Sequence, residues 1–201
     1  TFWFDIPGQP PVKRNYSISC APNDETYRIS VKREAHGLAS GWLHDNARPG
    51  MVLKVSPPAG EFFLPEQPQR PVVLLSGGVG LTPMVSMLET LVQRNPEVQV
   101  HYVHGTYGGQ THAMGEHVQR LAASRPGISS STFYEAPAAN DAQGLHYDHA
   151  GLIDGAWLTA QTPIREADYY LCGPRPFLRA LVTQLSEAGV PTDRIHYEFF
   201  G

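Results

Sequence analysis

The segment Val72–Pro83, which reads VVLLSGGVGLTP, constrains the fold more than any other part of this 201-residue chain. A continuous apolar run of this kind is typical of a parallel strand that is buried on both faces. The run leads into Gly77, Gly78 and Gly80, which allow a tight turn and a close approach of the backbone to a phosphate. A helix that begins near Pro83 would offer free N–H groups to the same anion. The segment therefore predicts a strand, turn and helix of an open α/β sheet, either as a phosphate site or as a plain structural turn.

The residues after this segment alternate between strand and helix patterns. We predict strands at 98–103, 131–134, 168–172 and 195–200, helices at 84–92, 114–121 and 177–185, and a loop at 136–152. Such alternation is typical of a doubly wound parallel sheet with helices on both faces.

The first third of the chain has a different pattern. Period-two alternation predicts half-buried strands at 2–4, 16–19, 27–32 and 51–55, with a short helix at 39–46. Pro65, Pro68 and Pro71 then punctuate a polar stretch. We therefore place a domain boundary here, with domains at 1–66 and 71–201. The chain begins with Thr1, next to a strand already under way, which predicts a fragment of a longer protein.

The composition excludes several classes of function. The net charge of -4 and the scattered lysines and arginines argue against nucleic-acid and anionic-membrane partners. The apolar runs are too short to cross a bilayer. With only Cys20 and Cys172 in 201 residues, a disulfide scaffold is not expected, and a reducing compartment such as the cytoplasm is predicted.

Two further motifs lie where chemistry is expected. Leu171–Pro174 (LCGP) ends a strand and opens a helix, the sheet edge at which open α/β folds bind ligands. Arg14–Ser17 (RNYS) offers a guanidinium fork for a pyrophosphate, an aromatic ring and a hydroxyl. Neither motif alone is a strong signal. A small buried thiol would explain the first equally well, and a surface arginine the second. The ordinary Rossmann fingerprint does not fit, because Pro83 replaces its third glycine and His104–Thr106 stands where an acidic residue is expected.

As a set, and in the chain order Arg-x-Tyr-Ser, Gly-Gly-Val-Gly-x-Thr-Pro and Cys-Gly-Pro, the three motifs resemble the ferredoxin-NADP reductase superfamily. The resemblance is strongest to the C-terminal reductase part of flavohemoproteins, the nitric oxide dioxygenases. The segments Ile29–Glu34, Trp42–Asp45, Pro58–Phe63 and Ile195–Gly201 strengthen the resemblance, which covers nearly the whole chain. Val103–Thr106 and His112–Gly115 look more like reductases fused to MOSC or pyridoxamine-phosphate-oxidase-like domains, often with a 2Fe–2S domain.

The resemblance implies a fold, an activity and a set of site residues. The fold is an antiparallel β-barrel FAD domain, incomplete at its N-terminus, followed by the doubly wound nucleotide domain. Hydride passes from NAD(P)H to FAD, and single electrons then pass to a heme globin or an iron–sulfur partner. FAD is bound by Arg14, Tyr16, Ser17, Val31, Lys32, Gly37, Leu38, Ala39 and Ser40, and covered by Phe199, Phe200 and Gly201. The dinucleotide is bound by Gly78, Val79, Gly80, Leu81, Thr82 and Pro83, with Cys172, Gly173 and Pro174 at the nicotinamide. Ser17, Cys172 and Glu198 are the catalytic candidates.

Coenzyme choice follows from charge. A 2′-phosphate requires an arginine or lysine near the end of the second strand, and residues 104–119 contain neither. We therefore predict NADH over NADPH.

Three other readings are weighed. A metal site is disfavoured because His101 and His104 point to opposite faces of one strand, so the histidines are expected to be ordinary surface or loop residues. A hydrolase is disfavoured because no Gly-x-Ser-x-Gly elbow surrounds Ser76. A non-catalytic dinucleotide-binding regulatory subunit is the remaining alternative.

Overall fold

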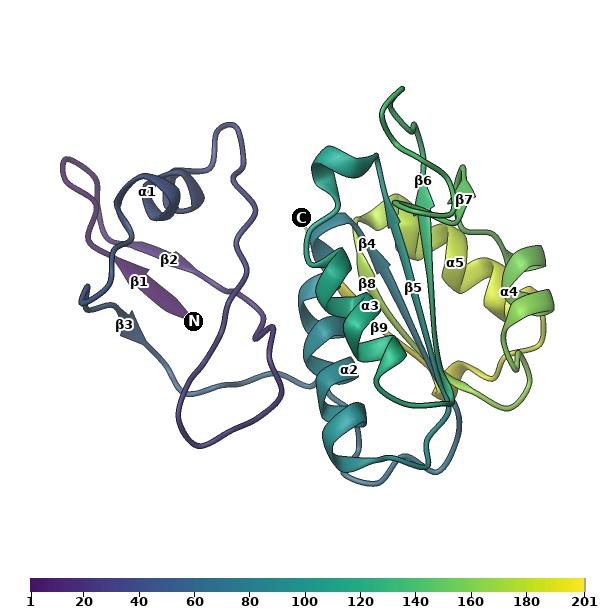
Figure 1. Ribbon diagram of the computed structural model, residues 1–201. Helices are drawn as coiled ribbons and strands as arrows, with labels where there is room; N and C mark the ends of the chain where they lie inside the picture. The colour runs from purple at the N-terminus through teal and green to yellow at the C-terminus, as the bar shows by residue number, and fades with distance from the viewer. Residues whose placement is uncertain (201) are drawn as a thin grey trace.

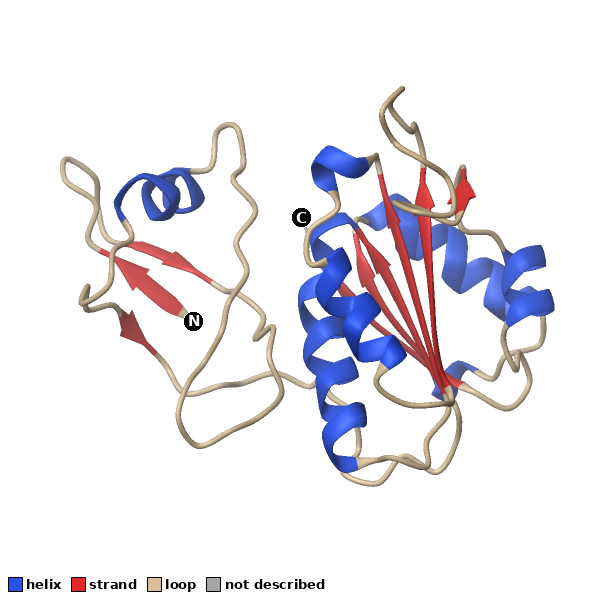
Figure 2. Ribbon diagram, viewed as in Figure 1, coloured by secondary structure: helices blue, strands red, loops and turns tan. Residues whose placement is uncertain are grey.

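The computed structural model describes residues 1–200, which form two parts that lie beside each other (Figures 1 and 2). The N-terminal part (residues 1–66) contains a three-stranded antiparallel sheet and one helix. The α/β part (residues 71–200) contains a six-stranded sheet with helices on both faces. The predicted fold class is confirmed. Within residues 1–200, the antiparallel β-barrel expected for the FAD domain is present as an open three-stranded sheet.

The N-terminal sheet has the strand order β2-β1-β3. Its elements are β1 (Phe2–Phe4), β2 (Val12–Arg14), β3 (Lys54–Val55) and the helix α1 (Leu38–Asn46). Phe4, Ile6, Val12, Ala39 and Leu43 form its buried cluster, which fastens α1 to the sheet. The predicted helix and the strand at 2–4 are confirmed, and the strand at 51–55 shortens to its last two residues.

The strands expected at 16–19 and 27–32 are wrong as regular strands. The backbones of the two segments pair only through an antiparallel bridge between Ile18 and Ile29 and a hydrogen bond from the Ser19 N–H to the Arg28 carbonyl. The alternation reflects the partly buried Tyr16 and Val31, which pack on the N-terminal cluster. The stretch between the two segments packs against a helix of the α/β part instead of continuing a sheet ladder.

The large sheet has the strand order β7-β6-β5-β4-β8-β9, and all its pairs are parallel. Its strands are β4 (Val72–Gly77), β5 (Val100–Thr106), β6 (Ile128–Tyr134), β7 (His149–Ala150), β8 (Asp168–Gly173) and β9 (Ile195–Phe199). Its helices are α2 (Leu81–Arg94), α3 (Gly115–Ala123), α4 (Gly155–Gln161) and α5 (Arg175–Glu187). Helices α2 and α3 cover one face, and α4 and α5 cover the other (Figure 1).

Three short elements, strands β2 and β7 and helix α4, were missed by the sequence analysis, which gave no strand at Val12–Arg14. Strand β7 has two residues and lies inside the predicted loop. Helix α4 buries only Leu158 fully, so its apolar periodicity is weak. The sequence does mark the N-terminus of α4, because Asp154 is an N-cap residue. Its carboxylate accepts the Trp157 N–H at 2.7 Å.

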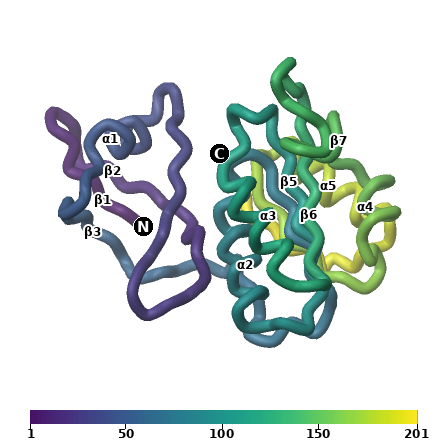
Figure 3. The backbone as a smooth tube through the Cα atoms, viewed as in Figure 1, coloured from purple at the N-terminus to yellow at the C-terminus, as the bar shows by residue number. Residues whose placement is uncertain are grey.

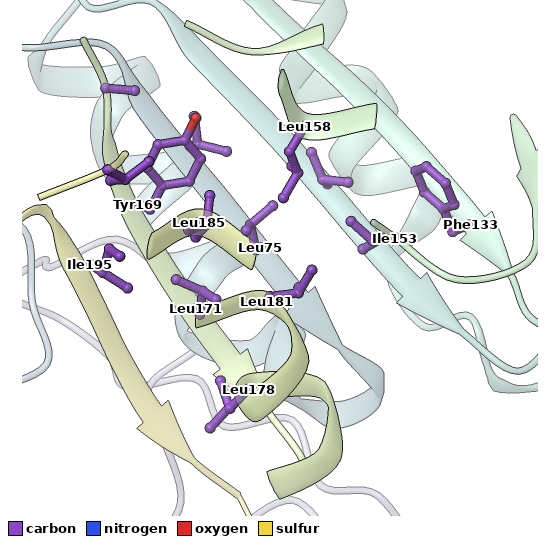
Figure 4. Close-up of a cluster of buried hydrophobic side chains, with 14 residues drawn as sticks. Leu75, Phe133, Ile153, Leu158, Tyr169, Leu171, Leu178, Leu181, Leu185 and Ile195 are labelled. Atoms are coloured by element: carbon purple, nitrogen blue, oxygen red, sulfur yellow. The ribbon is translucent and has the colours of Figure 1, made fainter. Parts of the chain in front are cut away.

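The continuous apolar run of β4 reflects burial on both faces. Successive side chains of a strand point to opposite sides. Val73 and Leu75 therefore join the cluster beneath α4 and α5, while Val72 and Leu74 join the cluster beneath α2 and α3. Figure 4 shows Leu75 and Leu171 packed against Leu181 and Leu185 of α5. Each such fully buried leucine contributes roughly 1.5–3 kcal/mol.

The strand order places a topological switch point between β4 and β8. From β4 the chain moves to β5 on one side, while β8 returns to pair with β4 on the other. Ligands of open α/β sheets bind outside the carboxyl ends of the strands at such a point. The ends in question are Gly77 and Gly173.

The two parts touch through residues 20–30, which lie against α2 (Figure 3), and through Phe62 and Leu64, which pack on the cluster beneath α2 and α3. The Ser86 hydroxyl donates to the Cys20 carbonyl at 2.7 Å, and the Arg94 guanidinium donates to the Pro22 carbonyl at 2.8 Å. These contacts fix the position of the N-terminal part relative to the switch point.

Candidate functional site

The turn after β4 combines two kinds of glycine. Gly78 has a φ of +53° and open space where a Cβ would stand, so its backbone can approach a ligand. A Cβ on Gly80 would instead overlap the backbone of β8, standing 2.8 Å from the Gly173 nitrogen. A Cβ on Gly77 would stand 2.9 Å from the Phe177 ring, as would one on Gly173. Gly78 is thus the position with open space beside it, and the others hold the two strand ends together.

The start of α2 suits an anion. Its first turn holds no acidic residue, and no side chain caps it. The Thr82 hydroxyl is used locally, donating to the Val79 carbonyl at 3.3 Å. Because Leu81, Thr82 and Pro83 are buried, these residues offer the site backbone groups and the helix dipole more than side chains.

Cys172 lies beside this turn at the end of β8, and its side chain is fully buried. It stands opposite Glu198 in the β8–β9 register. Burial, aided by the Glu198 charge, raises the pKa of the Cys172 thiol far above its ordinary value. Burial also raises the pKa of Glu198. Cys172 is therefore a neutral thiol that packs at the site and is unsuited to act as a thiolate nucleophile.

The chain end returns to the same place. The Phe200 N–H donates to the Gly173 carbonyl at 3.1 Å, and its ring packs on the cluster that contains Leu81, Met84 and Cys172. Phe199 is 40% exposed, and the Arg175 guanidinium lies 4.5 Å from its ring centroid. Pro174 is exposed and caps the start of α5. Gly201 lies outside the described residues.

The Arg14–Ser17 motif lies at the end of β2. Arg14 is exposed, and within residues 1–200 its one hydrogen bond goes to the Lys13 carbonyl at 2.7 Å. Tyr16 is half-buried edge-on against Phe2 and Phe4, and this burial raises its pKa despite the nearby Arg14 charge. Ser17 is half-buried. The guanidinium thus keeps most of its donors available to a ligand.

The remaining predicted FAD residues lie around α1. The Val31 carbonyl lies 2.8 Å from the His44 imidazole nitrogen, and Lys32 pairs with Glu34 at 2.9 Å. Gly37 is the N-cap, and Leu38, Ala39 and Ser40 form an uncapped first turn without acidic residues. The Ser40 hydroxyl accepts the Glu34 N–H at 3.2 Å and donates to the Gly37 carbonyl at 3.3 Å. Ser40 therefore tightens the turn, leaving backbone N–H groups for an anion.

The structure brings the glycine turn after β4 into direct contact with the Cys-Gly-Pro turn. A short path links the Arg-x-Tyr-Ser motif to both. Ser17 precedes Cys20 by three residues, a reach of roughly 11 Å at most. The Cys20 carbonyl is bonded to Ser86, which follows Thr82 by one helical turn of about 6 Å. Within residues 1–200, no hydrogen bond or ion pair joins the Gly37–Ser40 turn directly to the glycine turn.

Two features escaped the sequence analysis. His104 was expected at the surface, but it is 1% exposed, accepts or donates a 2.8 Å bond at Ser76, and stacks on His112. Burial and the neighbouring His112 lower the pKa of His104 to about 3, so it stays neutral. The second feature is Asp141, whose carboxylate accepts the N–H groups of Gly109 at 3.2 Å and Ala138 at 2.8 Å. An acidic group thus does stand just beyond β5, although it comes from the loop after β6.

Strand ends that meet at a switch point, beside an antiparallel sheet with an Arg-x-Tyr-Ser motif, define a ferredoxin reductase-like oxidoreductase module. Residues 74–183 match the family model described as an oxidoreductase NAD-binding domain. The chain is 53% identical over 202 residues to a flavohemoprotein of Xylella fastidiosa and 48% identical over 192 residues to one of Bordetella pertussis. The two matches cover 100% and 94% of this chain but 49% and 48% of those proteins, so the chain spans about half the length of these relatives.

Solved structures agree. The flavohem-like FAD/NAD-binding domain of nitric oxide dioxygenase from Vibrio cholerae is 37% identical, with a TM-score of 0.89 over 100% of this chain and 82% of that one. A flavohemoglobin from Malassezia yamatoensis with bound FAD and heme shares the fold at 23% identity, with a TM-score of 0.80 over 100% of this chain and 50% of that one. The chain belongs to the flavohemoprotein reductase family. Its predicted class, an NAD(P)H-dependent flavin oxidoreductase module, is thereby confirmed.

Two features are absent from residues 1–200. No helix there has both the length and the apolar character that a membrane span requires. No three potential metal ligands among His, Cys, Asp and Glu gather there.

Proposed function

We propose that this chain takes hydride from NADH onto FAD and passes electrons singly to a heme globin unit. The observation that carries the proposal is the juxtaposition of the open Gly78 turn with the buried Cys172–Gly173 strand end at the switch point. A dinucleotide phosphate bound at the first would bring its nicotinamide toward the second.

The residues of the N-terminal part fit a flavin dinucleotide. Arg14 has unengaged donors, α1 begins uncapped at Gly37, and Tyr16 offers a half-buried ring. We assign FAD binding to residues 1–66 and dinucleotide binding to residues 71–201. Val31 and Lys32 would border the ring system, and Phe199, Phe200 and Gly201 would cover it. When bound, the flavin supplies the ability to accept a hydride and to release its electrons one at a time.

The residues of the chain itself bind and orient the FAD and the nicotinamide dinucleotide, and they exclude water from the site. Ser17 would present its hydroxyl at the reacting edge of the flavin, while the neutral Cys172 thiol and Glu198 would lie behind the nicotinamide. No protein proton has to move in the hydride step, so the catalytic contribution of these residues is proximity and orientation.

Coenzyme preference is assigned to NADH. Residues 104–119 contain no lysine or arginine, and the Asp141 carboxylate at Gly109 adds negative charge where a 2′-phosphate would stand. Steady-state kinetics with both coenzymes test this. We expect kcat/KM to favour NADH, and Asp141→Asn, which keeps the acceptor oxygen, to raise kcat/KM for NADPH about tenfold. A wild-type preference for NADPH would refute the assignment.

The electron acceptor is assigned from the relatives. The similarity to flavohemoproteins, and to a flavohemoglobin with bound FAD and heme, supports a globin in the same polypeptide. A 2Fe–2S domain, or a MOSC or pyridoxamine-phosphate-oxidase-like domain, is the alternative partner. A cytoplasmic location is proposed on the two free, buried cysteines.

The direct test is anaerobic addition of NADH to the FAD-loaded protein. The yellow flavin absorbance should bleach at once, and adding an oxidised heme protein should restore it. A protein that stays yellow in excess NADH would support the alternative, a non-catalytic dinucleotide-binding subunit.

A further inference from the structure

The joint between the two parts is centred on one carboxylate, Glu89 of α2, which is 7% exposed. One of its oxygens lies 2.6 Å from the Arg28 guanidinium and 2.6 Å from the His117 imidazole. The other accepts the Ala21 N–H at 2.8 Å. A single buried side chain therefore binds three donors from three places in the chain.

Two of the three donors come from the segment that the proposed flavin residues enclose. Ala21 and Arg28 lie between Ser17 and Val31, while His117 comes from α3. The Arg28 guanidinium also donates to the Ser19 carbonyl, which ties Glu89 to the residue two positions after Ser17. We call Glu89 with Ala21, Arg28 and His117 the Glu89 joint.

The Glu89 carboxylate stays ionised in this joint. Burial alone would raise the pKa of Glu89, but hydrogen bonds from Arg28, Ala21 and His117 bring that pKa below its ordinary value. A buried carboxylate is tolerated only when such partners satisfy it, and removing its charge leaves the partners unpaired. The contact of the Glu89 carboxylate with its partners is therefore much harder to break than a solvent-exposed ion pair.

We propose that Glu89 is a positioning residue, which fixes residues 20–30 on α2 and so sets the approach of nicotinamide to flavin. This inference rests on the proposed function, since Ser17 and Val31 lie on the flavin side and the first turn of α2 on the dinucleotide side. Hydride transfer requires van der Waals approach of the two rings, and a displacement of about 1 Å can slow such a step about 100-fold.

The joint itself is tested without cofactor. In Glu89→Gln the Ala21 amide loses its charged acceptor, and we expect its hydrogen exchange to accelerate at least about tenfold. The matched control is Glu97→Gln, which neutralises an exposed carboxylate in the loop after α2. Unchanged Ala21 protection in Glu89→Gln would overturn the inference, whatever the protein's activity.

The consequence for chemistry is tested in the FAD-loaded protein by stopped-flow. We expect Glu89→Gln to slow flavin reduction at saturating NADH about 100-fold, with bound FAD and the KM for NADH within about twofold of wild type. The long-wavelength charge-transfer absorbance of stacked nicotinamide and flavin should weaken in parallel. A wild-type reduction rate in Glu89→Gln would overturn the positioning role.

Two further variants keep the test decisive. If Glu89→Gln does not fold, Arg28→Gln removes one donor and should give the same pattern at smaller amplitude. The double variant Glu89→Gln/Arg28→Gln should lose no more than Glu89→Gln, because the two groups act as a unit. Additive losses would contradict the joint. If wild-type flavin is never reduced by NADH, the proposed function fails while the exchange result still stands.

Discussion

Replacing Gly80 with alanine tests whether the two strand ends must touch at the switch point. The added Cβ would stand 2.8 Å from the Gly173 nitrogen and still closer to the Cys172 carbonyl, whereas ordinary contacts begin at 3.4 Å. The atoms in its way are backbone of β8, which is paired on both sides by β4 and β9. They cannot rotate aside as a flexible side chain would.

The cost follows from that overlap. Overpacking of a rigid interior typically costs 1–3 kcal/mol, and a clash with backbone belongs at the upper end, about 3 kcal/mol. For a chain of this size, each kcal/mol lowers Tm by about 2–4 °C, so we expect a fall of roughly 6–12 °C. Scanning calorimetry or circular dichroism measures it.

The matched control is Gly41→Ala in α1. Its Cβ meets nothing within 4 Å, and Gly41 lies inside a helix, where alanine is more favourable by up to about 1 kcal/mol. We therefore expect a small rise in Tm. If Gly80→Ala melts within about 1 °C of wild type, the close approach of the glycine turn to β8 is wrong.

Three further predictions concern Arg14, His104 and Cys172. Arg14→Ala should change stability by less than about 0.5 kcal/mol but weaken FAD binding at least tenfold, measured as flavin retained after gel filtration; full retention would refute the assignment. The folded His104 has a pKa of about 3, whereas the unfolded chain takes up its proton near 6.5, so the unfolded state binds more protons below that pH. His104 should therefore lower the free energy of unfolding by about 2 kcal/mol between pH 7 and pH 5 in urea titrations, a dependence that His104→Asn reduces. Cys172 should resist iodoacetamide in the native protein and react once it is unfolded, as mass spectrometry of the labelled peptide will show; rapid native labelling would contradict its burial.

Periodicity predicted most of the α/β part because it reports burial directly. The unbroken apolar run of β4 and the stripe of α5 arise from the cores on the two faces of the sheet, so the pattern survives in the sequence. The same reasoning failed at residues 16–19 and 27–32. Alternation there reflects the partial burial of Tyr16 and Val31 against the N-terminal cluster, and a strand cannot be distinguished from an irregular segment by its buried face alone.

The motifs of the candidate site can be read from the sequence, but their relative geometry cannot. The glycines after β4, the Cys-Gly-Pro turn and the Arg-x-Tyr-Ser motif are all local, and strand order places the first two together. The sequence could not tell that Gly78 is open while Gly80 meets β8, because that difference depends on a strand about ninety residues away in the chain.

The amino-acid sequence by itself determined the fold class, the two switch-point motifs and the absence of basic residues after β5, since each is written in neighbouring residues. Only the tertiary structure decided that Asp141 stands at Gly109, that His104 is buried, and that Glu89 binds Ala21, Arg28 and His117. A glutamate within a helix is by default a solvent-facing residue. Its partners here lie 68, 61 and 28 positions away, and such contacts leave no local pattern because they exist only after the chain has folded.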